Sequence, residues 1–241
     1  GVYKGVYAVE EFMTKRVIEN SRKREGPIIR ISEDFLWDHW AYYLGDEIYD
    51  DVSDESAGVF SAKKTITSST LSGYASYAIT QLNKLRRGEV PTEQVFDVDL
   101  YARLQAILDI FTSEHGRIWH NMRNYYNPVT ALLEPIPFDE LAFSNTDSVL
   151  IDKLSYSDYF GFSQCDEFKD LYRQYLLQLT ADYPNFIARH QEKIDQIVTT
   201  LQRYSDTYST NVFKVNDRIQ ELQGMFDVTE PTFELSYNYD N

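Results

Sequence analysis

The most constraining part of this chain is the segment from Asp109 to Glu140, DIFTSEHGRIWHNMRNYYNPVTALLEPIPFDE. Its first residues are typical of the end of a helix, and a polar loop follows. A tyrosine-rich run, the turn dipeptide Asn127-Pro128 and an apolar return then predict a short β-hairpin. Asp139 comes directly after this hairpin. A short hairpin folds the chain back on itself, so we expect the loop and this carboxylate to lie close together.

The loop and the end of the hairpin contain candidate metal ligands. Asn121 closes the loop and Asp139 follows the hairpin. Amide and carboxylate oxygens are hard ligands that suit Mg²⁺ or Mn²⁺. The alternative is structural, because Asn121 can cap a turn and Asp139 can cap the next element.

Two histidines of the same loop suggest a second chemistry. His115 and His120 are five positions apart around Gly116, and histidine pairs bind zinc or act as acid and base. A metal-dependent hydrolase would use these two histidines with Asp139. Their spacing matches neither HExxH nor another closed zinc motif, and a histidine among aromatic residues is commonly a packing residue.

Charge and cysteine content exclude several classes of protein. The 241 residues include 23 basic and 38 acidic ones, a formal charge of −15. Nucleic-acid binding through phosphates needs a basic surface, and so does adhesion to anionic membranes. No run reaches the roughly 18 apolar residues of a membrane span, so we expect no membrane insertion. Cys165 is the only cysteine, which rules out an intrachain disulfide and a thiolate zinc cluster.

The order of the expected elements predicts an α+β protein with three regions. Residues 1–60 form a strand-containing region, with strands at 1–11 and 28–31 and a short helix within 12–24. Because the chain opens inside a strand-like run, GVYKGVYAVEE, we expect this region to be incomplete at its N-terminus. Residues 61–226 form a mainly helical region that contains the segment 113–140, and 227–241 form a polar tail. An acidic run near residue 50 is expected to be a solvated loop.

Helical periodicity and stop signals place the helices of the second region. A helix over 70–87 is expected to end at Arg86-Arg87-Gly88, because basic residues followed by glycine favour a helix stop. Further helices are predicted near 166–181, 185–204 and 211–225, with Pro184 separating the first two. The helix that leads into the polar loop is predicted to bury one face: Leu100, Leu104, Ile107, Leu108 and Phe111. A second apolar stripe follows Phe168, Leu171, Tyr172, Tyr175, Leu176 and Leu179.

The block HNMRNYYNPVTALLEPIPFD, residues 120–139, resembles the CotH family, the spore-coat protein kinases and their secreted relatives. That family shows a similar HN, a tyrosine-rich strand, a turn, a second strand and a terminal Pro-aromatic-Asp. Three other segments are similar to family segments: GVYKGVYAVEE at the start, REGPIIRI at 24–31 and EVPTEQVFDVDLYARLQAI at 89–107. The resemblance covers roughly residues 1–180.

The resemblance implies an atypical protein-kinase-like fold with ATP and Mg²⁺ (or Mn²⁺) as cofactors and a protein Ser or Thr as the acceptor. Kinases hold metal through an Asn of the catalytic loop and an Asp after a hairpin, which Asn121 and Asp139 match. The family's catalytic loop Asp is replaced here, so Glu114 or His115 would orient the acceptor hydroxyl. The resemblance also implies an extracellular location, or one at the cell or spore surface.

Other family positions also depart from the pattern. Arg30 stands where a phosphate-binding lysine is expected, and a surface arginine fits the sequence equally well. Glu11 or Glu10 would orient Arg30, or both are solvated. A second family carboxylate falls on Leu141, and Glu140 would substitute for it. These departures leave open a catalytically inactive surface or structural module on the same fold, which would bind a protein partner.

Overall fold

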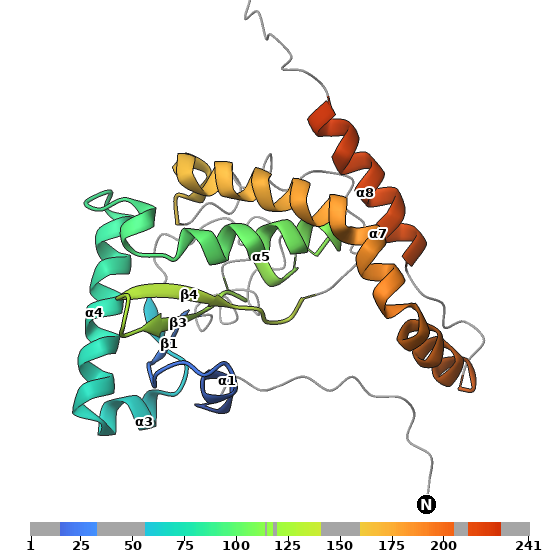
Figure 1. Ribbon diagram of the computed structural model, residues 1–241. Helices are drawn as coiled ribbons and strands as arrows, with labels where there is room; N and C mark the ends of the chain where they lie inside the picture. Colours follow the sequence, from blue (N-terminus) through green and yellow to red (C-terminus); the bar gives the residue numbers. More distant parts are fainter. Residues whose placement is uncertain are drawn as a thin grey trace, which may run out of the picture.

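The computed structural model describes residues 15–32, 56–113, 115–117, 120–140, 160–204 and 212–227. This described part is α+β, as the sequence predicts, with one small antiparallel sheet and a mostly helical remainder (Figure 1). The predicted strand at 1–11 with Glu11, the acidic run near residue 50, Glu114 and the tail after Asp227 lie outside the described residues. None of the helices in the described ranges is long and apolar enough to span a membrane.

The sheet joins strands from both sides of residue 60. It contains β1 (Ile28–Ile31), β2 (Ala57–Val59), β3 (Arg123–Asn127) and β4 (Leu132–Ile136) in the order β2-β1-β3-β4. The predicted strand at 28–31 and the predicted hairpin are therefore confirmed, whereas β2 was not predicted. The expected strand at 28–31 thus pairs directly with the hairpin of the second region.

Strand register decides which side chains face the core. Ile29 and Ile31 are fully buried in the main core, and antiparallel pairing sets Ile29 opposite Asn124 and Val59. Because side chains alternate along a strand, Arg30 and Arg123 lie on the other face, where they are paired in register. The segment 23–27 is bonded to this outer face, through Tyr125 Oη donating to the Arg24 carbonyl at 2.5 Å.

The described helices are α1 (Lys15–Asn20), α3 (Ala62–Thr67), α4 (Ser69–Arg86), α5 (Val98–Ile110), α7 (Asp166–Gln202) and α8 (Val212–Asp227). Helix α4 begins at the N-cap Ser68, whose hydroxyl accepts from the Leu71 amide. Its predicted stop is confirmed, since Gly88 has a φ of 68° and donates to the Leu85 carbonyl at 2.8 Å. Helix α5 likewise begins at Asp97, which accepts from the Leu100 amide at 3.0 Å.

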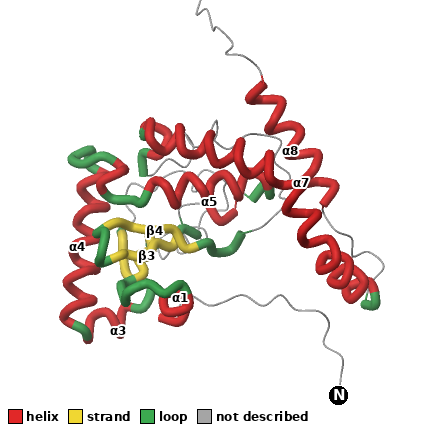
Figure 2. The backbone as a smooth tube through the Cα atoms, in the orientation of Figure 1, coloured by secondary structure: helices red, strands yellow, loops and turns green. Residues whose placement is uncertain are grey.

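Helix α5 buries a different face from the predicted one. Its buried positions include small and polar residues: Val98, Tyr101, Ala102, Gln105, Ala106, Leu108, Asp109 and Ile110. Of the predicted face only Leu108 is buried, and Ile107 and Phe111 are each 37% exposed. The reason is that α5 lies between the sheet and α7 (Figure 2). The helix therefore has to pack closely against two neighbours at once. A periodic pattern of large apolar residues does not reveal such a two-sided environment.

The predicted break at Pro184 is wrong, because α7 runs without interruption from Asp166 to Gln202 with the proline inside it. Figure 1 shows the helix changing direction past its middle, which is the usual effect of a proline on a helix. Asp182 supports the adjoining turns, since its carboxylate accepts from Asn185 at 3.3 Å and Arg189 at 3.0 Å. These bonds also lower the pKa of Asp182. The stripe from Phe168 to Leu179 is confirmed as the inward face.

Aromatic rings fill the space between α5, α7 and the hairpin. Phe96 contacts Phe160 and Phe162 with ring centroids 4.9 and 5.2 Å apart, and Tyr101 lies 4.7 Å from Phe162. Phe96 is fixed by its backbone, because the amide of Asp97 donates to the Leu133 carbonyl at 2.9 Å and the Leu133 amide donates to Val95 at 2.8 Å. The start of α5 is therefore attached to β4, and the loop that follows α5 returns to the same hairpin.

The buried phenol of Tyr125 makes the free energy of unfolding depend on pH in the alkaline range. Burial, followed by the nearby charge of Glu134, raises the pKa of Tyr125 to about 12, against about 10 in an unfolded chain. Between these values the folded protein keeps a proton that the unfolded chain has lost. The free energy of unfolding therefore falls as the pH rises from about 10 to 12, by about 1.4 kcal/mol per pH unit for this group.

We expect Tyr125→Phe to remove this contribution to the pH dependence of the free energy of unfolding. At neutral pH the variant should lower that free energy by about 1 kcal/mol, because the hydrogen bond to Arg24 is lost. Urea unfolding at pH 8, 10 and 11 measures both quantities. Tyr77→Phe is the control, since Tyr77 is 46% exposed. Equal alkaline slopes for Tyr125→Phe and the parent protein would show that the phenol does not titrate as expected.

Candidate functional site

Three of the predicted site residues meet at one imidazole. His115 Nδ1 lies 3.2 Å from Asp139 Oδ2 and 3.1 Å from the Asp139 carbonyl oxygen. The same nitrogen lies 3.1 Å from Asn121 Nδ2, and this amide also donates to the His115 carbonyl at 2.9 Å. The hairpin thus joins the loop residue Asn121 to Asp139, as expected from the order of the segment.

The neighbours of His115 indicate which of its ring nitrogens carries the proton. Asp139 presents two oxygens to Nδ1, and both can only accept a hydrogen bond. Asn121 has the backbone carbonyl of His115 as an acceptor for its amide. A proton on Nδ1 donated to Asp139 satisfies all these groups and leaves the lone pair on Nε2. A carboxylate that orients an imidazole in this way prepares the far nitrogen to accept a proton.

The backbone at both ends of this cluster is in the left-handed region. Thr112 has a φ of 46° and Asp139 a φ of 54°. Asp adopts this conformation at small cost because its side chain bonds locally, but a β-branched threonine is an outlier there. Such strained residues are concentrated at functional sites. Here they turn the chain sharply after α5 and again after β4, so that the two segments face each other.

Glu140 fastens the loop to the segment after the hairpin. Ser113 Oγ donates to Glu140 Oε2 at 3.0 Å. The Glu140 carboxylate also occupies the space that a Cβ at position 116 would take, so Gly116 permits the close approach. Glu140 is thus placed beside the cluster, where a second acidic group was expected.

Arg30 lies on β1, the strand beside the hairpin. It pairs in register with Arg123, two residues after Asn121. The Arg123 guanidinium donates to the His120 carbonyl at 2.5 Å and to the Met122 carbonyl at 3.2 Å, and it lies 4.9 Å from the Phe138 ring. Arg123 therefore fixes both ends of the hairpin beside the cluster, a role that sequence reasoning missed.

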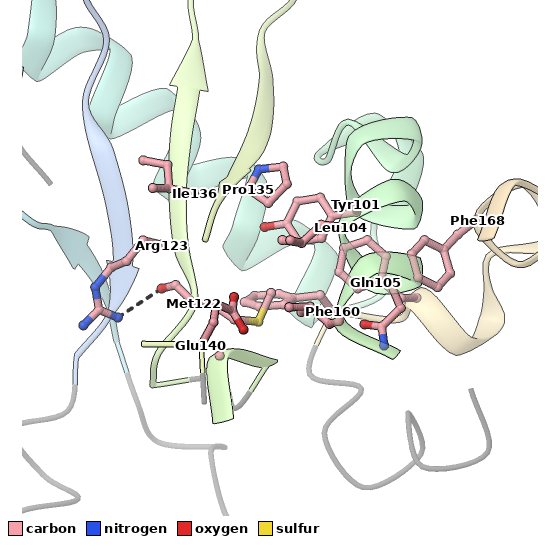
Figure 3. Close-up of a pocket in the computed structure, with 13 residues that line it drawn as sticks. Tyr101, Leu104, Gln105, Met122, Arg123, Pro135, Ile136, Glu140, Phe160 and Phe168 are labelled. Atoms are coloured by element: carbon pink, nitrogen blue, oxygen red, sulfur yellow. Dashed lines mark hydrogen bonds between the residues drawn. The ribbon is translucent and has the colours of Figure 1, made fainter. Parts of the chain in front are cut away.

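A small cavity lies next to the cluster, between α5, the hairpin and the start of α7 (Figure 3). Its volume is about 50 Å³, room for about three or four water molecules. Gly116 and Glu140 lie at its edge, adjacent in sequence to His115 and Asp139. The remaining walls are largely apolar: Tyr101, Leu104, Leu108, Met122, Pro135, Ile136, Phe160, Phe162 and Phe168. Figure 3 shows the Arg123 side chain directed away from the aromatic wall.

Gln105 gives this cavity an unsatisfied polar group. The side chain is 7% exposed, and its Nε2 is buried without a hydrogen-bond partner. Such a donor is costly to bury and is rare in native proteins. One feature of the sequence indicated this buried amide: a glutamine stands among the apolar residues of α5. The predicted face of the helix did not include this position.

We expect Gln105→Met to raise the free energy of unfolding by about 1 kcal/mol, because methionine has a similar volume and leaves no buried donor unpaired. Chemical denaturation measures the change. Gln178→Met is the control, since Gln178 lies on the exposed face of α7 and should change stability by less than about 0.5 kcal/mol. A loss of stability in Gln105→Met would mean that the amide is satisfied in solution, for example by bound water.

The donors near His115 fit a magnesium ion better than a zinc ion. In the described ranges no three His, Cys, Asp or Glu side chains are grouped to hold a metal, and structural zinc needs such a closed set. Magnesium needs fewer protein ligands, because it is held by one or two carboxylates together with phosphate oxygens and water. Asp139 and Asn121 can supply such a partial set. The zinc hydrolase alternative has no support from these residues.

No protein-family model matches this chain, and no curated protein matches it.

Proposed function

We propose that this protein is a CotH-like atypical protein kinase that transfers the γ-phosphoryl group of ATP to a Ser or Thr hydroxyl of a surface or coat protein. The observation that carries the proposal is the meeting of Asn121 and Asp139 at His115. An Asn at the end of a loop, a hairpin and then an Asp is the order in which kinases place their two metal ligands.

In this proposal each residue of the cluster has one task. Asp139 and Asn121 would hold Mg²⁺, which would neutralise charge on the phosphates. His115 keeps Asp139 oriented through Nδ1, and its Nε2 accepts the proton of the acceptor hydroxyl. The hydroxyl oxygen forms a bond to the γ-phosphorus while the bond to the β–γ bridging oxygen breaks and ADP leaves. Arg30 contributes positive charge for the phosphates from β1.

Glu114 is a second candidate for the base, and Glu11 a candidate to orient Arg30; both stay predictions. His115 and Glu114 can be separated by substitution. The Glu114→Gln variant should keep its rate of phosphoryl transfer if His115 is the base, and should lose it if Glu114 is the base.

The experiment that tests the proposal is intact-mass analysis after incubation with ATP and Mg²⁺ or Mn²⁺, with and without a mixture of Ser- and Thr-containing acceptor proteins. We expect mass increments of about 80 Da per phosphoryl group. Calorimetry with ATP, with and without metal, should show binding that depends on the metal. Absence of both the increments and the binding would contradict the kinase proposal.

A second candidate is a catalytically inactive binding module on the same fold. It is favoured by the replacement of the family's loop Asp and by Arg30 in the place of a phosphate-binding lysine. A protein that neither binds ATP nor gains phosphate, yet captures a surface protein, would favour this candidate.

A further inference from the structure

The second half of α7 carries an apolar stripe that continues past the body of the protein. Figure 1 shows this part of the helix projecting away from the sheet. Six residues of the helix follow the alternating spacing of four and three that defines a coiled-coil seam: Tyr183, Ile187, His190, Ile194, Ile197 and Leu201. We call this set the α7 seam. In heptad terms, Ile187, Ile194 and Leu201 take position a, and the other three take position d.

The main core covers only the beginning of this stripe. Tyr183 is the last residue of α7 that packs against that core. Beyond it, Ile187, Ile194 and Leu201 are half-buried, whereas Ile197 is 50% exposed and the neighbouring Phe186 is 46% exposed. Among the described residues, α7 packs mostly on α5 and makes only a small contact with α8. A largely apolar stripe of a and d residues on a projecting helix is typical of a helix that packs against another helix.

The charges along this segment favour a second copy of the chain as the partner. Residues 185–204 contain three basic and two acidic residues, in a chain whose net charge is −15. Of the positions that flank the seam, only Lys193 is charged; the others are Phe186, Gln191, Val198 and Thr200. Two such surfaces can therefore meet without the repulsion that opposes contact between other parts of two acidic molecules.

We propose that the protein forms a homodimer in which two α7 seams pair in antiparallel orientation. Antiparallel pairing sets Ile187 opposite Ile197, and His190 opposite Ile194, so that every a residue meets a d residue. It also places the two acidic bodies at opposite ends of the paired segment, about 27 Å apart at 1.5 Å per residue. This separation exceeds the Debye length of about 8 Å at physiological salt, whereas parallel pairing would hold the bodies side by side. The proposal is independent of the kinase activity.

Sedimentation velocity of the whole chain over about a hundredfold range of concentration tests the dimer. We expect the mass of two chains for the parent protein and of one chain for the double variant Ile194→Glu, Ile197→Glu. The matched control is Ala188→Glu, Thr199→Glu, which adds the same charge on the opposite, exposed side of the helix and should remain dimeric. A parent protein that is monomeric throughout would overturn the proposal, and so would a dimer that both variants retain. If another part of the same chain covers the α7 seam, the parent protein is monomeric and the proposal is overturned.

Cysteine crosslinking tests the orientation and does not depend on the fold of the charged variants. An equimolar mixture of His190→Cys and Ile194→Cys should form a mixed intermolecular disulfide under mild oxidation, more readily than either variant alone. Cys165 is buried and should not compete. If Ile194→Cys alone crosslinks as readily as the mixture, the helices are parallel and the antiparallel arrangement is wrong.

Discussion

We expect Asp139→Asn to lower the rate of phosphoryl transfer by a factor of about 100 to 1000 or more while the fold stays intact. Loss of a charge that acts on the transferring phosphates typically costs several kcal/mol. Asn has the same shape as Asp and is also tolerated in the left-handed region, so the φ of 54° at this position is kept. His115 can still donate from Nδ1 to the amide oxygen and to the carbonyl of residue 139.

The measurement is the rate of phosphate incorporation for the parent protein and the variant, together with their urea unfolding curves. Asp182→Asn is the matched control, since Asp182 is an exposed carboxylate of α7 with its own bonds to Asn185 and Arg189. It should keep full activity. Unchanged phosphate incorporation in Asp139→Asn would contradict the assignment of Asp139 as a metal ligand, and an equal loss in Asp182→Asn would point to a general effect of charge.

The hairpin and the long helices could be predicted because their signals are local. The run from Arg123 to Ile136 contains two strand-forming segments and a turn, and the basic residues followed by Gly88 set the end of α4. The pairing of Ile28–Ile31 with β2 and β3 is not a local property. It depends on contacts between segments far apart in the chain, and Ala57–Val59 is too short to be predicted as a strand.

Pro184 shows where a local rule fails. Proline removes one helical hydrogen bond at a cost of about 3 kcal/mol, and the sequence rule therefore ends the helix there. The apolar stripe continues on both sides of it, and Tyr183 packs on the core. In the structure this packing, with the bonds of Asp182, outweighs the loss of one bond.

The site was predictable in part for the same reason. Asn121 and Asp139 meet because a hairpin of predictable length separates them, and His115 lies in the loop before it. The unpaired amide of Gln105 could not be predicted, because it depends on how α5, α7 and the hairpin pack together. The role of Arg123 in holding the hairpin could not be predicted either. It depends on hydrogen bonds to backbone carbonyls that face its guanidinium only in the folded chain.

The segment 23–27 must lie flat against β3, and Gly26 is the residue that allows it. The Tyr126 amide donates to the Pro27 carbonyl at 2.9 Å, and Lys23 forms an ion pair with the buried Glu134 on the same face. A Cβ on residue 26 would overlap the carbonyl oxygen of Tyr126, and it would lie 2.8 Å from the Tyr125 ring and 3.3 Å from Pro128. The carbonyl belongs to the backbone of a central strand and cannot turn aside.

We therefore expect Gly26→Ala to lower the free energy of unfolding by about 3 kcal/mol or more, because the segment has to move off the strand and lose these bonds. Gly73→Ala is the control. Gly73 lies within α4 with open space around its Cα, so alanine should stabilise the protein by about 0.5 to 1 kcal/mol through helix propensity alone. Chemical denaturation of both variants should give changes of opposite sign. A Gly26→Ala variant as stable as the parent protein would mean that residues 23–27 do not lie on β3 in solution, and the ion pair between Lys23 and Glu134 would then be lost with that contact.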